Sequence, residues 1–212
     1  MIVLALDTCL AACAVAVSRN DALIGWTVEP MIRGHQERLA PMVADLMAAR
    51  GVAFAAIDRI AVTVGPGSFT GLRVGLAFAK GLALALGRPC VGVGTLEALA
   101  ASLDVGGPAA VVVDAGRGQV YLQLFEGGMA ISGPDVLPSD LAVSRVAEVF
   151  PSGELVLGGP GAHLLSSALR RATIADIATP DPRAIARLGA RAPLVAPRPL
   201  YLRPPDAKAK AA

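Results

Sequence analysis

Hydrophobic and polar positions follow two different periods along this 212-residue chain, and the change of period separates strands from helices. Three short apolar segments joined by turns predict three strands at the start. From Glu37, apolar residues recur every three or four positions until Gly51, which predicts a helix. Helix and strand patterns then alternate. The elements predicted in this half are strands 2–6, 14–18 and 23–28, helix 37–50, strand 60–64, helix 70–86, strand 90–93 and helix 95–103.

The same order of patterns begins again after Gly106-Gly107-Pro108. Two copies of one strand-strand-strand-helix-strand-helix unit predict an α/β fold of the duplicated RNase H-like or actin-like type. The subdomains are expected at residues 1–105 and 106–212, the second ending in a proline-rich extended tail from residue 197 to 205. Element order supports this fold by analogy and does not settle function. The elements predicted in the second half are strands 109–113, 119–125 and one near residue 130, helix 138–149, strand 155–157, helix 161–171, strand 174–177 and helix 182–191.

A glycine-rich turn, Gly65-Pro66-Gly67-Ser68-Phe69-Thr70-Gly71, joins a predicted strand to a predicted helix. This order invites phosphate binding, because helix N-termini attract anions. A Walker A loop, however, needs Lys and then Ser or Thr after its last glycine, and here Leu72 and Arg73 follow. The glycine spacing also misses the dinucleotide fingerprint by one residue. We therefore favour a tight turn that leads into a packed helix.

The helix predicted at 70–86 is apolar almost all round, and small residues recur at every fourth position from Gly71 to Ala83. Such a helix must be covered on every side, and a sheet covers only one. The helix at 37–50 also has a broad apolar face. We expect the two helices to dock on a second chain; the alternative is that each buries its surplus within one subunit. The predicted contact residues are Leu39, Met42 and Leu46 on the first helix and Gly71, Leu72, Gly75, Leu76 and Ala79 on the second.

Composition narrows the function classes. The net charge is only +2 and aromatic residues make up 4%, which gives no independent support for direct nucleic-acid binding. The three cysteines lack metal-ligand spacing and do not require an oxidising compartment. The chain shows no signal-peptide pattern and no apolar run of about 20 residues, so we expect a cytoplasmic protein without a membrane span.

Candidate catalytic groups are few. The chain has two histidines, and His35 is followed four residues later by Leu39, where a metal-binding pair would need a second histidine. Asp7 and Asp114 each end an apolar strand beside a turn, where actin-like folds place groups that face a nucleotide phosphate. We expect at most a vestigial nucleotide site there, with backbone hydrogen bonding in the turns as the alternative. No catalytic residue, metal or cofactor is predicted.

Several segments together resemble one family. They are Leu4-Ala5-Leu6-Asp7-Thr8, His35 with Leu39 and Pro41, the block from Gly65 to Gly75, Asp114-Ala115-x-Arg117-Gly118-x-Val120-Tyr121 and Tyr201-Leu202-Arg203-Pro204. In this order they resemble the TsaB family of tRNA threonylcarbamoyladenosine biosynthesis proteins, over nearly the whole chain. One departure is Gly116, where the family pattern has a bulkier residue.

The resemblance implies a non-catalytic subunit that forms a heterodimer with a larger paralogue, TsaD, through its first two helices. TsaD carries a two-histidine metal motif and transfers the threonylcarbamoyl group to the adenosine next to the anticodon, in tRNAs that read codons starting with A. The TsaE ATPase joins the complex, and this subunit associates with tRNA only through the complex. Whether the chain also forms a homodimer stays open.

The main alternative is an enzyme, a divergent ATPase or small-molecule kinase of the same superfamily, with Asp7 and Asp114 at its nucleotide site. The segment Thr8-Cys9-Leu10-Ala11-Ala12 argues against it, because it lacks phosphate-loop glycines after Asp7. A metalloprotease is a more distant alternative, since the histidine pair is absent.

Overall fold

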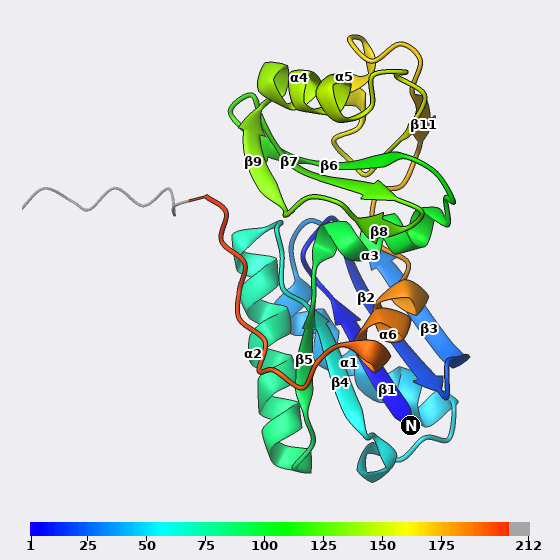
Figure 1. The fold of residues 1–212 in the computed structure, drawn as a ribbon. Coiled ribbons are helices and arrows are strands. Elements are labelled where there is room, and N and C mark those ends of the chain that lie inside the picture. Colours follow the sequence, from blue (N-terminus) through cyan, green and yellow to red (C-terminus); the bar gives the residue numbers. More distant parts are fainter. Residues whose placement is uncertain (204–212) are drawn as a thin grey trace, which may run out of the picture.

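The computed structural model describes residues 1–203, which form two lobes, each built on one mixed β-sheet (Figure 1). The part of the predicted C-terminal extension at residues 204 and 205 lies outside the described residues. In Figure 1 the first lobe is at the bottom and the second at the top, with α3 (Thr95–Leu103) between them.

The first sheet has the strand order β3-β2-β1-β4-β5. Strand β1 lies at its centre and pairs antiparallel with β2 and parallel with β4. All six residues of β1 are buried, because helices cover both faces of the sheet. The strands are β1 (Ile2–Asp7), β2 (Ala12–Arg19), β3 (Ala22–Pro30), β4 (Arg59–Thr63) and β5 (Cys90–Val93).

The side chains of β1 alternate between two apolar cores. Leu4 and Leu6 point to the face that α1 (His35–Ala49) and α2 (Phe69–Leu86) cover. Val3 and Ala5 point to the opposite face, which α6 (Pro182–Arg191) covers. A short 3₁₀ turn, η1 (Phe54–Ala56), links α1 to β4.

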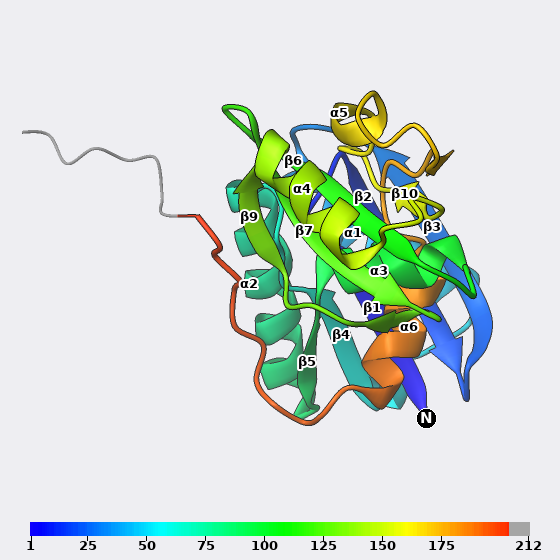
Figure 2. The ribbon, with the colours of Figure 1, turned by 45° about the horizontal axis from the view of Figure 1, so that its top comes forward.

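The second sheet repeats this topology, with the order β11-β10-β6-β7-β8 and β9 also paired to β7. Its first strand along the chain, β6, is again central, antiparallel to β7 and parallel to β10. The helices α4 (Ser139–Val149) and α5 (His163–Ser166) cover one face, and α3 covers the other. Figure 2 looks onto the α4 side of this sheet. The predicted duplicated α/β fold is therefore confirmed. The strands are β6 (Ala109–Gly116), β7 (Gln119–Glu126), β8 (Met129–Ala130), β9 (Asp135–Pro138), β10 (Val156–Gly158) and β11 (Thr173–Ala175).

Helix α6 departs from the predicted division of the chain, because it returns to the first lobe. A Cβ at Gly189 would lie 2.2 Å from the Cβ of Ala61, so two small residues allow α6 to lie directly on β4. The Arg59 guanidinium also donates to the carbonyl oxygens of Gly189, Ala190 and Ala192. The first lobe is thus completed by residues 182–191.

Two details of the second lobe also differ from prediction. The helix predicted at 161–171 is regular only over α5, where the Ser166 hydroxyl donates to the His163 carbonyl at 2.9 Å and competes with helix bonding. Strand β9 was not predicted, and its last residue, Pro138, was predicted to begin the following helix.

Candidate functional site

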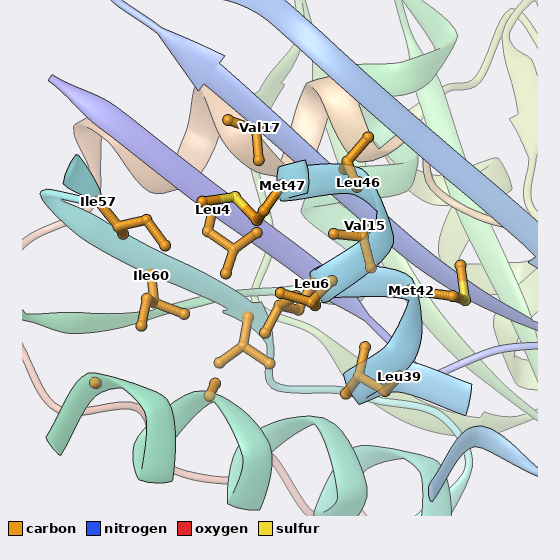
Figure 3. Packing of buried hydrophobic residues seen from close by; sticks show 14 of the residues in the cluster. Leu4, Leu6, Val15, Val17, Leu39, Met42, Leu46, Met47, Ile57 and Ile60 are labelled. Carbon is orange, nitrogen blue, oxygen red and sulfur yellow. The ribbon is translucent and has the colours of Figure 1, made fainter. Parts of the chain in front are cut away.

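The eight predicted contact residues lie on the inward faces of α1 and α2. Each is at most 6% exposed or is a buried glycine, so the subunit's own core covers them. Figure 3 shows the α1 side chains directed at β1 and β2. The prediction that this face meets a second chain is therefore corrected: the sheet is what it contacts. The residues are Leu39, Met42, Leu46, Gly71, Leu72, Gly75, Leu76 and Ala79.

The small residues of α2 allow contact with the turn after β1. A Cβ at Gly71 would lie 1.9 Å from the carbonyl oxygen of Thr8, and one at Gly75 would lie 2.5 Å from the Thr8 Oγ1. The Thr8 hydroxyl donates to the Gly71 carbonyl at 2.7 Å, and the Ser68 N–H donates to the Cys9 carbonyl at 2.7 Å. The glycine-rich block thus closes the end of β1, as expected for a tight turn leading into a packed helix.

The glycine turn after β10 repeats this arrangement in the second lobe. A Cβ at Gly159 would lie 2.4 Å from the Val112 carbonyl oxygen, and one at Gly161 would lie 2.8 Å from the Asp114 nitrogen. In each lobe, a glycine turn that follows the strand parallel to the central strand therefore packs onto the backbone at or just beyond the end of that central strand.

The outer face of α2 is the surface that sequence reasoning missed. We define it as Phe69, Ala77, Gly81, Leu84 and Ala85, all exposed. Leu84 is 85% exposed, and nothing lies within 4 Å of a Cβ built at Gly81. The signal for it was a second small stripe, Ala77-Gly81-Ala85, with the same four-residue spacing as the buried one.

The outer face of α1 is also composed of small residues. We define it as Ala40, Pro41, Ala44 and Ala48, all exposed. Near the helix starts, a groove of about 520 Å³ runs between Gln36 and α2. It is lined by Gln36, Phe69, Thr70, Arg73, Val74, Ala77 and Phe78.

Among residues 1–203, α2 is the one helix that is long and apolar enough to cross a membrane by length and composition. Only 33% of it is buried within the chain. Its inner face packs on β4 and α1, so the most exposed apolar residues lie on its outer face, with the partly buried Val74, Phe78, Leu82 and Leu86 beside them.

The structure separates the two aspartates of the predicted nucleotide site by burial. Asp7 is fully buried, and its Oδ1 accepts from the Thr63 hydroxyl at 2.6 Å and the Cys9 N–H at 3.0 Å. Burial raises the pKa of the Asp7 carboxyl, and its Oδ2 has no hydrogen-bond partner among residues 1–203. Asp114 is exposed and accepts from the Gly116 N–H at 2.7 Å.

Each aspartate therefore bonds the amide two residues later, as turn chemistry predicts. Thr8 and Cys9 are buried under the glycine-rich block, where an ATPase of this fold would need an open phosphate loop. His35, the first residue of α1, is 6% exposed, and its Nε2 has no hydrogen-bond partner in the described part of the chain. No group of three His, Cys, Asp or Glu side chains within residues 1–203 is placed to hold a metal ion.

Comparison with known proteins agrees with this geometry. Residues 25–153 match the family model described as TsaD: tRNA N6-adenosine threonylcarbamoyltransferase. The tRNA threonylcarbamoyladenosine biosynthesis protein TsaB of Escherichia coli is 36% identical over 169 residues, covering 76% of this chain and 72% of that protein. An uncharacterized protein of Mycobacterium tuberculosis is 36% identical over 212 residues, 97% of this chain and 93% of that protein.

Solved structures also resemble this chain. YeaZ from Pseudomonas aeruginosa is 30% identical, with a TM-score of 0.80 over 95% of this chain and 99% of that one. The ROK hexokinase of Thermus thermophilus, at 16% identity and a TM-score of 0.51 over 91% of this chain and 98% of that one, shares the fold alone. The chain therefore belongs to the TsaB family, within the wider group of proteins that match the TsaD family model.

Proposed function

We propose that this chain is a non-catalytic partner subunit in tRNA threonylcarbamoyladenosine biosynthesis, and that it forms a heterodimer with a TsaD-like catalytic paralogue. The E. coli and Bacillus subtilis relatives are named for this biosynthesis, which supports the pathway. The match to the TsaD model supports a paralogue of the same fold as the partner, since related chains often pair through equivalent surfaces.

The observation that carries the proposal is the outer face of α2. Phe69 and Leu84 are large apolar side chains that are 42% and 85% exposed on one helix. Burying one such side chain against a partner contributes about 1.5–3 kcal/mol. The small residues between them, with those of α1, let partner helices approach to the usual 8–10 Å between axes.

The two outer faces differ in charge. Arg73 and Lys80 lie among the apolar residues of α2, whereas on α1 the exposed Asp45 already pairs with Arg38 of the same helix, with 3.7 Å between Oδ2 and Nη1. A partner with acidic side chains opposite α2 would therefore be favoured, because charge complementarity fixes register more than affinity.

The closed turn after β1 supports the non-catalytic part of the proposal. Asp7 is buried, its pKa is raised by that burial, and α2 covers Thr8 and Cys9. The paralogue then catalyses the threonylcarbamoyl transfer. A TsaE-like ATPase and tRNA would join the assembled complex in the cytoplasm.

The test is binding to the TsaD-type paralogue of the same organism, measured by light scattering on a sizing column and by calorimetry. Leu84→Glu places a charge on the outer face of α2, in the last turn of the helix, and should weaken the complex at least tenfold, because about 1.4 kcal/mol is a factor of ten. Leu141→Glu is the matched control, since Leu141 is a 53% exposed leucine on α4 of the other lobe.

Equal loss of binding in both variants, or in neither, would show that the outer face of α2 is not the contact. A wild-type chain that forms a stable homodimer and ignores the paralogue would replace the heterodimer with self-association on the same face.

A further inference from the structure

Two sequence motifs that lie far apart in the chain meet in the structure. Residues 197–203, here the C-terminal strap, follow α6 after a short connection and run along α2 (Figures 1 and 2). At the end of the strap, Arg203 donates from Nη1 to the carbonyl oxygen of Ala115 at 2.7 Å. The motif around residue 201 is thus bound to the motif around residue 114.

The strap is anchored on the first lobe at the start of α2. The Leu200 N–H donates to the Val64 carbonyl at 2.8 Å, as a strand would. The Tyr201 ring lies 5.4 Å from the Phe69 ring, and the Tyr201 hydroxyl accepts from the Arg73 Nε at 3.1 Å. The Arg73 guanidinium lies 3.8 Å above the Phe69 ring, a cation–π distance.

The turn that Arg203 holds is conformationally unusual. Three successive residues, Gly116, Arg117 and Gly118, have φ angles of 73°, 57° and 73°. A left-handed φ is unfavourable for a residue with a side chain such as Arg117. At Gly116 the glycine suits this backbone. The Gly116 N–H donates to Asp114, and the Ser139 N–H and hydroxyl donate to the Gly118 carbonyl, so the turn also has contacts within its own lobe. The charge-assisted hydrogen bond from Arg203 adds a contact from the C-terminal strap.

We propose that Tyr201 and Arg203 form a latch that couples the outer face of α2 to the β6–β7 turn of the second lobe. Phe69 and Arg73 belong both to the anchor of the strap and to the groove beside the outer face of α2. A partner that binds at this end of α2 shifts the anchor, and Leu202 and Arg203, which connect Tyr201 to Ala115, transmit the shift. The part concerning a partner rests on the proposed function, whereas the latch itself does not.

The first test is hydrogen exchange of the full chain, followed by mass spectrometry. Arg203→Ala should speed amide exchange in residues 114–118 by about three- to tenfold, because a hydrogen bond to a charged group is removed from a locally opening segment. Tyr201→Ala should speed exchange in the same residues, although the contacts it removes are with Phe69 and Arg73 of the first lobe. Tyr201→Phe keeps the ring contact with Phe69 and loses the hydrogen bond from Arg73, so it should speed exchange less than Tyr201→Ala. Arg171→Ala, which removes an ion pair with Glu154 within the second lobe, is the control and should not change this turn.

An effect of Arg203→Ala without an effect of Tyr201→Ala would make the Arg203 bond a local contact and overturn the latch. Unchanged exchange in both variants would overturn it as well. Melting curves of the variants test whether general unfolding is the cause. Tyr201 is 45% exposed, so its removal leaves no large cavity and the melting temperature should stay close to that of the wild-type chain.

The second test adds the TsaD-type paralogue. Binding should slow exchange of residues 114–118 in the wild-type chain and leave it unchanged in Arg203→Ala, while both chains show protection of residues 69–86. If the paralogue does not bind the wild-type chain, the proposed function fails and the first test alone decides the latch. If it binds both chains and the turn responds equally in both, the latch fails and the proposed function stands.

Discussion

Substituting Gly71 by alanine tests whether the buried small stripe exists for contact within the subunit. The new Cβ would lie 1.9 Å from the Thr8 carbonyl oxygen, whereas ordinary contact begins at 3.4 Å. The obstacle is backbone, so α2 itself must shift. Overpacking of this kind costs about 1–3 kcal/mol. The shift also weakens the buried Thr8–Gly71 hydrogen bond, worth about 1 kcal/mol.

The higher helix propensity of alanine offsets part of this destabilisation, because alanine is more favourable than glycine in a helix by about 1 kcal/mol. We therefore expect Gly71→Ala to lower the free energy of unfolding by about 1–3 kcal/mol. Gly81→Ala is the matched control on the same helix, since nothing lies within 4 Å of the position its Cβ would occupy. It should raise stability by about 0.5–1 kcal/mol.

The assay is urea unfolding followed by circular dichroism, with melting temperatures as a second measure. For a chain of this size 1 kcal/mol corresponds to about 2–4 °C, so the two variants should separate by several degrees in opposite directions. If Gly71→Ala is as stable as wild type, the argument that α2 needs this glycine to lie on the β1–β2 turn is wrong. If Gly81→Ala destabilises the isolated chain, the outer face of α2 is not open as described.

Three further predictions concern buried polar groups and can be checked on the isolated chain. The folded state raises the pKa of Asp7 above its ordinary 3.8, so its contribution to stability is complete below that pH and declines as the pH rises towards the folded pKa. Asp7→Asn should therefore reduce the loss of stability between pH 4 and neutral pH, which urea midpoints at several pH values measure; an unchanged pH profile would contradict the assignment. Burial raises the pKa of the Cys9 thiol to about 12 and those of Cys13 and Cys90 to about 11, so thiol reagents at pH 8 should label the folded chain far more slowly than the unfolded chain. Arg59→Met removes the donor to three carbonyl oxygens at the end of α6 and should destabilise the chain by about 1–3 kcal/mol, with faster amide exchange in α6 as the signature. Unchanged exchange there would show that apolar packing alone holds this helix.

Much of the fold could be predicted from the local pattern of apolar and polar residues. Helix α1, for example, was predicted within two residues of its start and one of its end, because one apolar stripe and a following glycine define it. The face of α2 that meets the sheet could not be predicted from the sequence, because the helix is apolar on all sides and carries two stripes of small residues. Periodicity identifies both stripes and cannot say which of them meets the sheet. Only the contacts with Thr8 distinguish them.

The lobe on which α6 packs was predicted wrongly for a different reason. Its pattern predicted the helix at the correct residues, 182–191, and position along the chain suggested the second lobe. The choice of lobe depends on non-local contacts, between Gly189 and Ala61 and between Arg59 and the end of the helix. These pair residues about 130 positions apart, a separation at which local sequence carries no information.

The return of α6 has a consequence for how the protein is made. During synthesis the strands of the first lobe leave the ribosome long before residues 182–191, so one face of the central sheet stays uncovered while the whole second lobe is translated. The residues that α6 covers, among them Val3, Ala5 and Ala61, are then accessible to chaperones or to other chains. Release of α6 is the event that completes the first lobe, and a ribosome that stalls before it produces a chain that exposes a ready-made aggregation surface.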